Sequence, residues 1–300
     1  MVTRSALLML VYNHAPDPDS LTRALNQVDC LVLIDNHSRP EVVATLREFA
    51  QSNPTRTVLI ENDTNLGISR AYNRAVELVR GQGIQWVYFL DHDAVFGESL
   101  LVETRALWDR LVAEGRTPGL VVPIVTDDPS CLGTNLGIRE QYSPVRSAIT
   151  SGMLTTVDIL ASLGGFDERM FCEQVDLELS MRMRAHHLDV VRLNKVLILQ
   201  KFEEKPRMAG RLSRFMNRLV GYRSRVRIAM DNANIYRTTS SVYSNARQKD
   251  LDWSIGYIGD KLHHTRFDMV FVRLVVKVER SSIKFAQKLG GPEFVPSEAQ

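Results

Sequence analysis

The sequence predicts an α/β protein built on a doubly wound, mostly parallel sheet, with a basic helical extension at the C-terminus. Two observations predict the sheet: short apolar runs alternate with helical patterns over the first 130 residues, and polar clusters follow the runs. A third, a basic composition after Phe202, predicts the extension. The chain has 300 residues, 44% of them hydrophobic and 24% charged, which is enough for a large core.

The expected elements follow in chain order. Runs dense in Val, Leu, Ile and aromatic residues predict buried strands at Ser5–Val11, Cys30–Ile34, Thr57–Ile60 and Trp86–Leu90. Helical patterns occupy Leu21–Asn26, Glu41–Gln51, Ser69–Arg80 and Ser99–Glu114. Further strands are expected at Leu120–Val125, Ala148–Thr156 and Val190–Leu199, with a helix from about Gln174 to His186.

Charge divides the chain into an expected catalytic domain, residues 1–203, and a helical basic region, residues 204–300. Residues 1–200 carry 18 Lys+Arg against 25 Asp+Glu, a net charge of −7, whereas residues 201–300 carry 19 against 10, which gives +9. Residues 205–230 predict a basic amphipathic helix. Such a helix binds an anionic membrane surface, or packs on the catalytic domain or on a second subunit as in a homodimer. Its few aromatic residues argue against nucleic acid as a partner.

The cysteines and the hydropathy pattern bear on the compartment. Cys30, Cys131 and Cys172 are widely spaced and form no Cys-x-x-Cys pair, so we expect neither disulfides nor a zinc site. No apolar run approaches the roughly 20 residues that span a bilayer, and the run Ala6–Val11 is too short for a signal peptide. The expectation is a cytoplasmic protein, peripheral on the inner face of the cell membrane if the basic helix binds lipid.

Ligands of such sheets bind at the carboxyl ends of the strands, where this sequence places polar residues. The strand-end segments are 12–14, 35–38, 61–65 and 91–93. Asp91 and Asp93 are two residues apart, so in an extended chain both carboxylates point the same way and suit Mg²⁺ or Mn²⁺ on a diphosphate. Taken alone, the pair is more typical of a helix-capping Asp with a solvated partner than of a metal site. His92 is expected to point to the opposite face in a structural role.

Two further segments carry candidate residues. Asn65-Leu66-Gly67 precedes a predicted helix, whose N-terminus can hold a phosphate. Glu173, Asp176 and Glu178, followed by Arg182, form a second acidic cluster at the start of another helix. Asp176 there can face a cleft while Arg182 anchors the region, although an acidic first turn also stabilises a helix through its macrodipole.

In order and spacing, these motifs resemble family 2 of the inverting glycosyltransferases, which implies the Rossmann-like GT-A fold. The resemblance spans about residues 5–200 and is closest to bacterial rhamnosyltransferases and related galactofuranosyltransferases. The segments that carry it are Val11-Tyr12-Asn13, Asp35-Asn36-His37-Ser38, Asn65-Leu66-Gly67 with Ala71 and Asn73, Leu90-Asp91-His92-Asp93, Ser151-Gly152-Met153, Gly164-Gly165-Phe166-Asp167, and Val175-Asp176-Leu177-Glu178 with Arg182.

The resemblance implies a role for each matching residue. Tyr12, Asn13 and Asp35 would contact the base and ribose of the donor, and Asn65, Gly67 and Asn73 would line its nucleotide pocket. Asp91 and Asp93 would hold the metal on the donor diphosphate, and Asp176 matches the catalytic base. Ser151, Gly152, Glu178 and Arg182 are the candidates for the sugar and acceptor side.

Two positions depart from the family pattern. His37 replaces a glycine in the turn after the second strand, so we expect an altered turn. Many relatives place a metal-binding histidine where this chain has Gln200, a weaker donor to a cation, and His186 and His187 are poorly placed to replace it.

The resemblance implies transfer of a sugar from a nucleoside-diphosphate donor to a glycan or polyisoprenyl-linked acceptor in surface polysaccharide synthesis of the O-antigen or capsule type. dTDP-rhamnose is the expected donor, and a UDP-sugar (galactofuranose, a hexose or an N-acetylhexosamine) is the alternative. A rival of another class, an Asp-x-Asp phosphohydrolase, would carry its acidic pair after the first strand, where this chain has Tyr12-Asn13-His14. A degenerate transferase acting as a nucleotide-sugar-binding subunit is the non-enzymatic alternative.

Overall fold

The computed structural model describes residues 4–172 and 175–200. The chain divides into two compact units, and all described residues except Cys172 belong to the first, Met1–Phe171 with Val175–Ala209. The predicted basic helix at 205–230, and with it the whole of the predicted region 204–300, lies outside the described residues. Among the described helices, none is long and apolar enough to cross a membrane.

One mixed sheet organises the described residues, and its first half is parallel. The strands of that half are β1 (Ser5–Val11), β2 (Cys30–Asp35), β3 (Thr57–Glu61) and β4 (Trp86–Asp91), in the spatial order β3-β2-β1-β4. Val11 lies opposite Asp35, Asp35 opposite Glu61, and Leu10 opposite Asp91, so these strands end at one edge. The polar clusters that follow them therefore meet there, as the sequence predicted.

The second half of the sheet mixes directions around one long strand. Its members are β6 (Pro118–Thr126), β8 (Met153–Thr156), β9 (Asp189–Leu199) and the short β5 (Val95–Phe96) and β7 (Tyr142–Pro144). β8 joins β4 to β6 by antiparallel pairing, β9 runs parallel to β6, and β5 and β7 each pair antiparallel with β9. β8 therefore begins beside the end of β4, where Met153 lies opposite Phe89.

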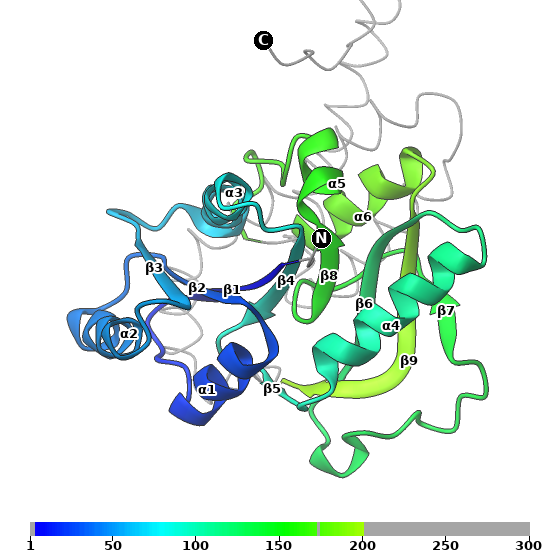
Figure 1. Ribbon diagram of the computed structural model, residues 1–300, viewed down its shortest axis with the longest axis horizontal. Coiled ribbons are helices and arrows are strands. Elements are labelled where there is room, and N and C mark those ends of the chain that lie inside the picture. The colour runs from blue at the N-terminus through cyan, green and yellow to red at the C-terminus, as the bar shows by residue number, and fades with distance from the viewer. Residues whose placement is uncertain (1–3, 173–174, 201–300) are drawn as a thin grey trace, which may run out of the picture. The chain divides into compact units, whose positions relative to one another are not determined.

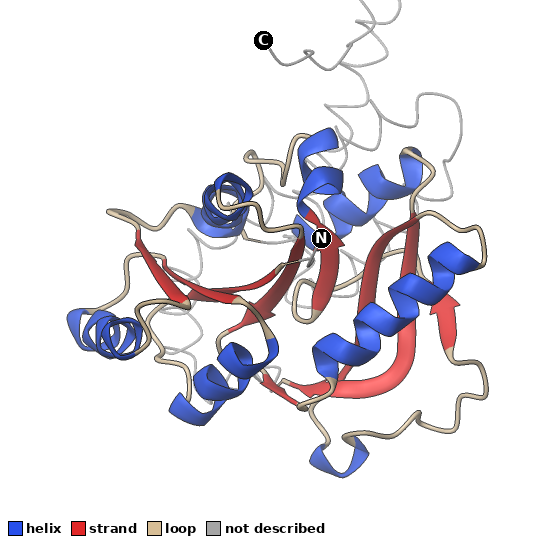
Figure 2. Ribbon diagram, in the orientation of Figure 1, coloured by secondary structure: helices blue, strands red, loops and turns tan. Residues whose placement is uncertain are grey.

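Helices cover both faces of the sheet (Figures 1 and 2). One face carries α1 (Pro18–Gln27), α2 (Pro40–Ser52) and α4 (Leu100–Ala113), whose buried residues form a common core with alternate residues of β1, β2 and β4. The other carries α3 (Gly67–Gly81), α5 (Val157–Ser162) and α6 (Val175–Ala185). α1 starts where its sequence directs, because the Asp17 carboxylate accepts from Ser20 N and Pro18 occupies the first turn.

The predicted doubly wound α/β fold is confirmed, and the differences are local. The strand expected over Ala148–Thr156 begins only at Met153, because Gly152 has a φ of +82° and turns the chain just before β8. Three short elements were not predicted: β5, β7 and α5. The 3₁₀ turn Pro129–Cys131 was also missed.

Candidate active site

The centre of the candidate site is the carboxylate pair Asp91 and Asp93 at the end of β4. Gln200, the residue after β9, reaches both: its Nε2 donates to Asp91 Oδ2 at 3.0 Å and to Asp93 Oδ1 at 3.1 Å. The short strand β5 produces this contact, because Val95 pairs with Leu199 and so brings the end of β9 back beside Asp93. Gln200 is held further by its backbone N–H, which donates to Thr126 O at 2.9 Å.

The environment of the pair suits a divalent cation. Asp93 is exposed and Asp91 half-buried, and burial raises the pKa of Asp91, with the Gln200 hydrogen bond opposing the rise and the Asp93 charge adding to it. No Lys or Arg in the described ranges forms an ion pair with either carboxylate. Two carboxylates and one carboxamide are hard donors of the kind that Mg²⁺ and Mn²⁺ prefer, so these three residues fit the predicted metal.

A metal site made wholly of acidic, His or Cys side chains is not found in the described segments: no group of three such side chains lies close enough together. Gln200 is the further side chain whose amide contacts both carboxylates. Its Nε2 faces the carboxylates here, and a half-turn of the amide would present the oxygen instead.

His92 lies between the two aspartates and is half-buried. Its ring is parallel to that of His14, with the centroids 6.1 Å apart and an interplanar angle of 6°. His14 follows β1, so this ring pair links the ends of β1 and β4. The contact agrees with the structural role expected for His92.

The loops after β1 and β2 are bound to each other. Asn13 N donates to Ser38 Oγ at 2.9 Å, and Asn13 Oδ1 accepts from Arg39 N at 3.1 Å. The buried Asp35 carboxylate accepts from the backbone N–H groups of His37 and Ser38. His37 has a φ of +69°, so the turn keeps the left-handed conformation that glycine favours, even without glycine. Tyr12, 45% exposed, stands at the opening of this region.

Two buried asparagines, Asn36 and Asn62, connect the loops after β2 and β3 to the start of α3. The sequence predicted no role for either residue. Asn36 Nδ2 donates to Asn65 Oδ1 at 2.9 Å, and Asn36 Oδ1 accepts from Leu66 N and from Asn62 Nδ2. Asn65 Oδ1 also accepts from Gly67 N at 3.0 Å. Their position directly after β2 and β3 was the signal that could have identified them.

Gly67 and Asn73 attach α3 to later parts of the chain. Gly67 has a φ of +78°, and a Cβ there would lie 2.4 Å from Phe171 O, so only glycine fits. The Asn73 amide binds the backbone of Phe166 on both sides, with Nδ2 donating to its O at 2.9 Å and Oδ1 accepting from its N at 2.7 Å. Asn73 thus fixes the loop Gly164–Asp167 against α3.

The second acidic cluster divides into two environments. Asp176 is half-buried in the first turn of α6, and its Oδ1 accepts from Leu177 N at 2.7 Å. The buried Glu178 and the half-buried Arg182 form a two-bond ion pair at 2.6 and 2.7 Å. Arg182 also donates to the carbonyls of Leu163 and Gly165. The anchoring role expected for Arg182 is therefore observed, and the Glu178 carboxylate is occupied by Arg182.

Ser151 and Gly152 lie beneath Asp91. The buried Ser151 Oγ accepts from Asp91 N at 3.5 Å, and Gly152 N donates to Phe89 O at 2.8 Å. A Cβ on Gly152 would lie 2.4 Å from Ile198 Cδ1 and 2.9 Å from the Pro123 ring. This segment therefore stabilises the end of β4 through hydrogen bonds to the backbone of Phe89 and Asp91.

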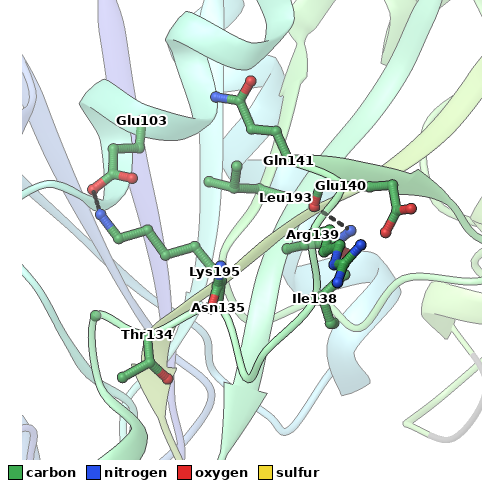
Figure 3. A pocket seen from close by; sticks show the side chains of 11 residues that line it. Glu103, Thr134, Asn135, Ile138, Arg139, Glu140, Gln141, Leu193 and Lys195 are labelled. Carbon is green, nitrogen blue, oxygen red and sulfur yellow. Dashed lines mark hydrogen bonds and ion pairs between the residues drawn. The ribbon is translucent and has the colours of Figure 1, made fainter.

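A separate cavity of about 460 Å³ lies beside β9, and Figure 3 shows its lining. Lys195 Nζ binds Glu103 Oε1 there at 2.7 Å. None of the residues that line it belongs to the predicted site.

Residues 8–114 match the family model described as Glycosyl transferase family 2. The match covers β1 to β4 and the pair Asp91 and Asp93, the part that carries the predicted donor site. This part of the chain is therefore similar to glycosyltransferase family 2 domains. No curated protein matches the sequence significantly.

Several solved structures share the fold at low identity. A mannosyltransferase, PcManGT from Pyrobaculum calidifontis in complex with GDP-Man and Mn²⁺, is 14% identical with a TM-score of 0.57, over 96% of this chain and 79% of that one. GalNAc-T7 with UDP, GalNAc and Mn²⁺ is 11% identical with a TM-score of 0.53, over 86% and 54%. TarS from S. aureus is 12% identical with a TM-score of 0.53, over 89% and 45%.

These similarities establish the GT-A fold for this chain. The chain spans about half the length of GalNAc-T7 and of TarS. Residues 8–114 are thus similar to glycosyltransferase family 2, and the chain has the GT-A fold.

Proposed function

We propose that this protein is a metal-dependent, inverting glycosyltransferase that uses a nucleoside-diphosphate sugar. The observation that carries the proposal is the convergence of Asp91, Asp93 and Gln200 at the edge where the parallel strands end. The solved structures of similar fold with UDP or GDP-Man and Mn²⁺ support a nucleotide donor and a divalent cation. When bound, such a cation neutralises the charge that develops on the leaving diphosphate.

The donor is proposed to lie along the strand ends from β2 to β4. Tyr12, Asn13 and Asp35 would face its base and ribose, and Asn65 and Gly67 would line its nucleotide pocket. The interlocked hydrogen bonds of Asn13 and Asn36 hold these loops in place before the donor arrives, which lowers the ordering cost of binding. Asn73 would contribute indirectly to this pocket, by fixing the loop at Phe166 through its hydrogen bonds to the Phe166 backbone.

Asp176 is the proposed general base. Its carboxylate would remove the proton from an acceptor hydroxyl as that oxygen attacks the anomeric carbon, and a single displacement inverts the anomeric configuration. Glu178 and Arg182 are proposed to position Asp176 by fixing α6 to the loop at Leu163–Gly165. Ser151 and Gly152 are proposed to border the sugar subsite while they support Asp91.

For the finer activity, we propose dTDP-rhamnose as donor and a glycan or lipid-linked glycan of a surface polysaccharide as acceptor. This choice rests on the resemblance of the motifs to rhamnosyltransferases. Calorimetry with Mn²⁺ against dTDP and UDP, followed by transfer assays with the corresponding sugars, tests it. Preference for UDP would replace rhamnose by a UDP-sugar.

The variant Asp176→Asn tests the mechanism. It should abolish transfer while nucleotide and Mn²⁺ affinities stay near those of the unchanged protein, because the carboxylate acts on the acceptor and not on the donor. Full transfer activity in this variant would refute the base assignment. If the unchanged protein binds nucleotide but shows no turnover with any donor, the nucleotide-sugar-binding subunit would be supported instead.

A further inference from the structure

Tyr72, on the inner face of α3, has a hydroxyl group without a hydrogen-bond partner. The side chain is fully buried, and no atom in the described part of the chain accepts from or donates to its Oη. Buried hydroxyl groups almost always find a partner, because leaving one unpaired is unfavourable. Such an exception calls for an explanation in terms of a state in which the partner is present.

The ring of Tyr72 packs on the same face of β4 from which Asp91 projects. It meets Phe89 edge to face, with the ring centroids 4.8 Å apart at 80°, and lies 5.6 Å from Phe166. Phe89 precedes Asp91 by two positions, and residues two apart in a strand point to the same side. Burial raises the pKa of the Tyr72 phenol well above its usual range, and the Asp91 charge contributes to the rise.

Asp91 has an oxygen atom available on its own side. Its Oδ2 accepts from Gln200, whereas Oδ1 accepts no hydrogen bond from the residues that the structure describes. The Tyr72 hydroxyl and Asp91 Oδ1 thus lie on the same side of β4, and neither has a hydrogen-bond partner among the described residues. If the Asp91 carboxylate reorients when it holds a cation, its oxygen could accept from the Tyr72 hydroxyl.

We propose that Tyr72 is a positioning residue for the metal site, whose hydroxyl donates to the Asp91 carboxylate when Asp91 and Asp93 hold a divalent cation. The inference rests on the proposed function. Outer groups that hydrogen-bond to a metal-binding carboxylate fix its orientation and raise the affinity for the metal. Here the hydrogen bond forms only when the cation is bound. It therefore raises the affinity for the cation, because the Tyr72 hydroxyl is unpaired in the metal-free protein.

The test compares Tyr72→Phe with Tyr88→Phe. Tyr88 is also a buried tyrosine and lies in β4, but it faces the opposite side and its hydroxyl donates to Leu101 O at 3.3 Å. For each variant, the affinity for Mn²⁺ is measured by calorimetry and the melting temperature is measured on the metal-free protein.

Tyr72→Phe should weaken Mn²⁺ binding by about tenfold, in the range of outer-group effects at metal sites, and leave the metal-free melting temperature unchanged or higher. Tyr88→Phe should lower that melting temperature and leave Mn²⁺ affinity unchanged. A purely structural hydroxyl at Tyr72 would give the pattern of Tyr88.

Two outcomes overturn the inference alone: equal Mn²⁺ affinity in Tyr72→Phe and the unchanged protein, or a metal-free Tyr72→Phe protein that melts lower or fails to fold. Absence of Mn²⁺ binding to the unchanged protein would refute the metal site of the proposed function as well. Mn²⁺ binding to the unchanged protein therefore distinguishes failure of the Tyr72 inference from failure of the proposed metal site.

Discussion

In the proposed metal site, Gln200 would be the third donor beside Asp91 and Asp93, whose carboxylates it contacts. A carboxamide oxygen binds Mn²⁺ less strongly than an imidazole nitrogen does. We expect Gln200→His to tighten Mn²⁺ binding by roughly tenfold, equivalent to about 1.4 kcal/mol, and Gln200→Ala to weaken it. Calorimetry measures both, with Gln51→Ala at the exposed end of α2 as control. Equal affinities for all four proteins would remove Gln200 from the site.

Asp91 should oppose folding when no metal is bound. Its pKa in the folded protein is raised, so the folded chain binds the proton more tightly than the unfolded chain does. This group therefore destabilises the fold above the unfolded pKa, near 3.9, and ceases to do so at lower pH. Asp91→Asn should raise the metal-free melting temperature at pH 7, with a smaller gain near pH 4, and abolish Mn²⁺ binding. A lower melting temperature at pH 7 would contradict this.

Among the elements, the turn before β8 supports the site most directly. Gly152 and Gly115 have similar φ values, +82° and +74°, but a Cβ meets Ile198 and Pro123 only at Gly152. Gly115→Ala should cost only the conformational penalty, about 1 kcal/mol, whereas Gly152→Ala adds a clash of about 1–3 kcal/mol. Thermal unfolding of both variants checks the difference. Because Gly152 adjoins Ser151, which binds Asp91 N, Gly152→Ala should also weaken Mn²⁺ binding.

The sequence predicted long elements well and short ones poorly. The strands around β4 were recognisable because their residues are apolar on both faces, and α3 because its apolar residues recur with helical spacing. β5 has only Val95 and Phe96, too few residues for any periodicity, yet it sets the position of Gln200. Local patterns therefore located the aspartates and left their third partner open.

The roles of the acidic cluster show a second limit of sequence reasoning. Glu178 was considered for acceptor contacts, but it is buried against Arg182. The two residues are four apart on α6, a spacing that brings side chains together on one helix face and was therefore available as a signal. Whether Asp176 faces the cleft instead depends on how α6 packs on β6 and β9, which only the fold determines.

At the scale of the whole molecule, all the described strands and helices that form the core lie before residue 210. The sheet and the helices on both its faces lie within residues 4–200. A chain ending at Ala209, the last residue of the first unit, should therefore unfold cooperatively and bind Mn²⁺ as tightly as the full chain. Circular dichroism during heating and calorimetry measure this. Loss of cooperative unfolding would show that the catalytic unit needs the basic region.

The contact of Gln200 with Asp91 joins positions that are 109 residues apart in the chain. A cation held there would act as a removable cross-link, closing a loop whose entropy an unfolded chain retains. Cation binding would then protect more than the site itself. The end of β9 near Leu199 is flanked on its outer side by the two-residue β5. Amide hydrogens of β9 should therefore exchange more slowly when Mn²⁺ is present, because the bound cation would stabilise this edge of the sheet.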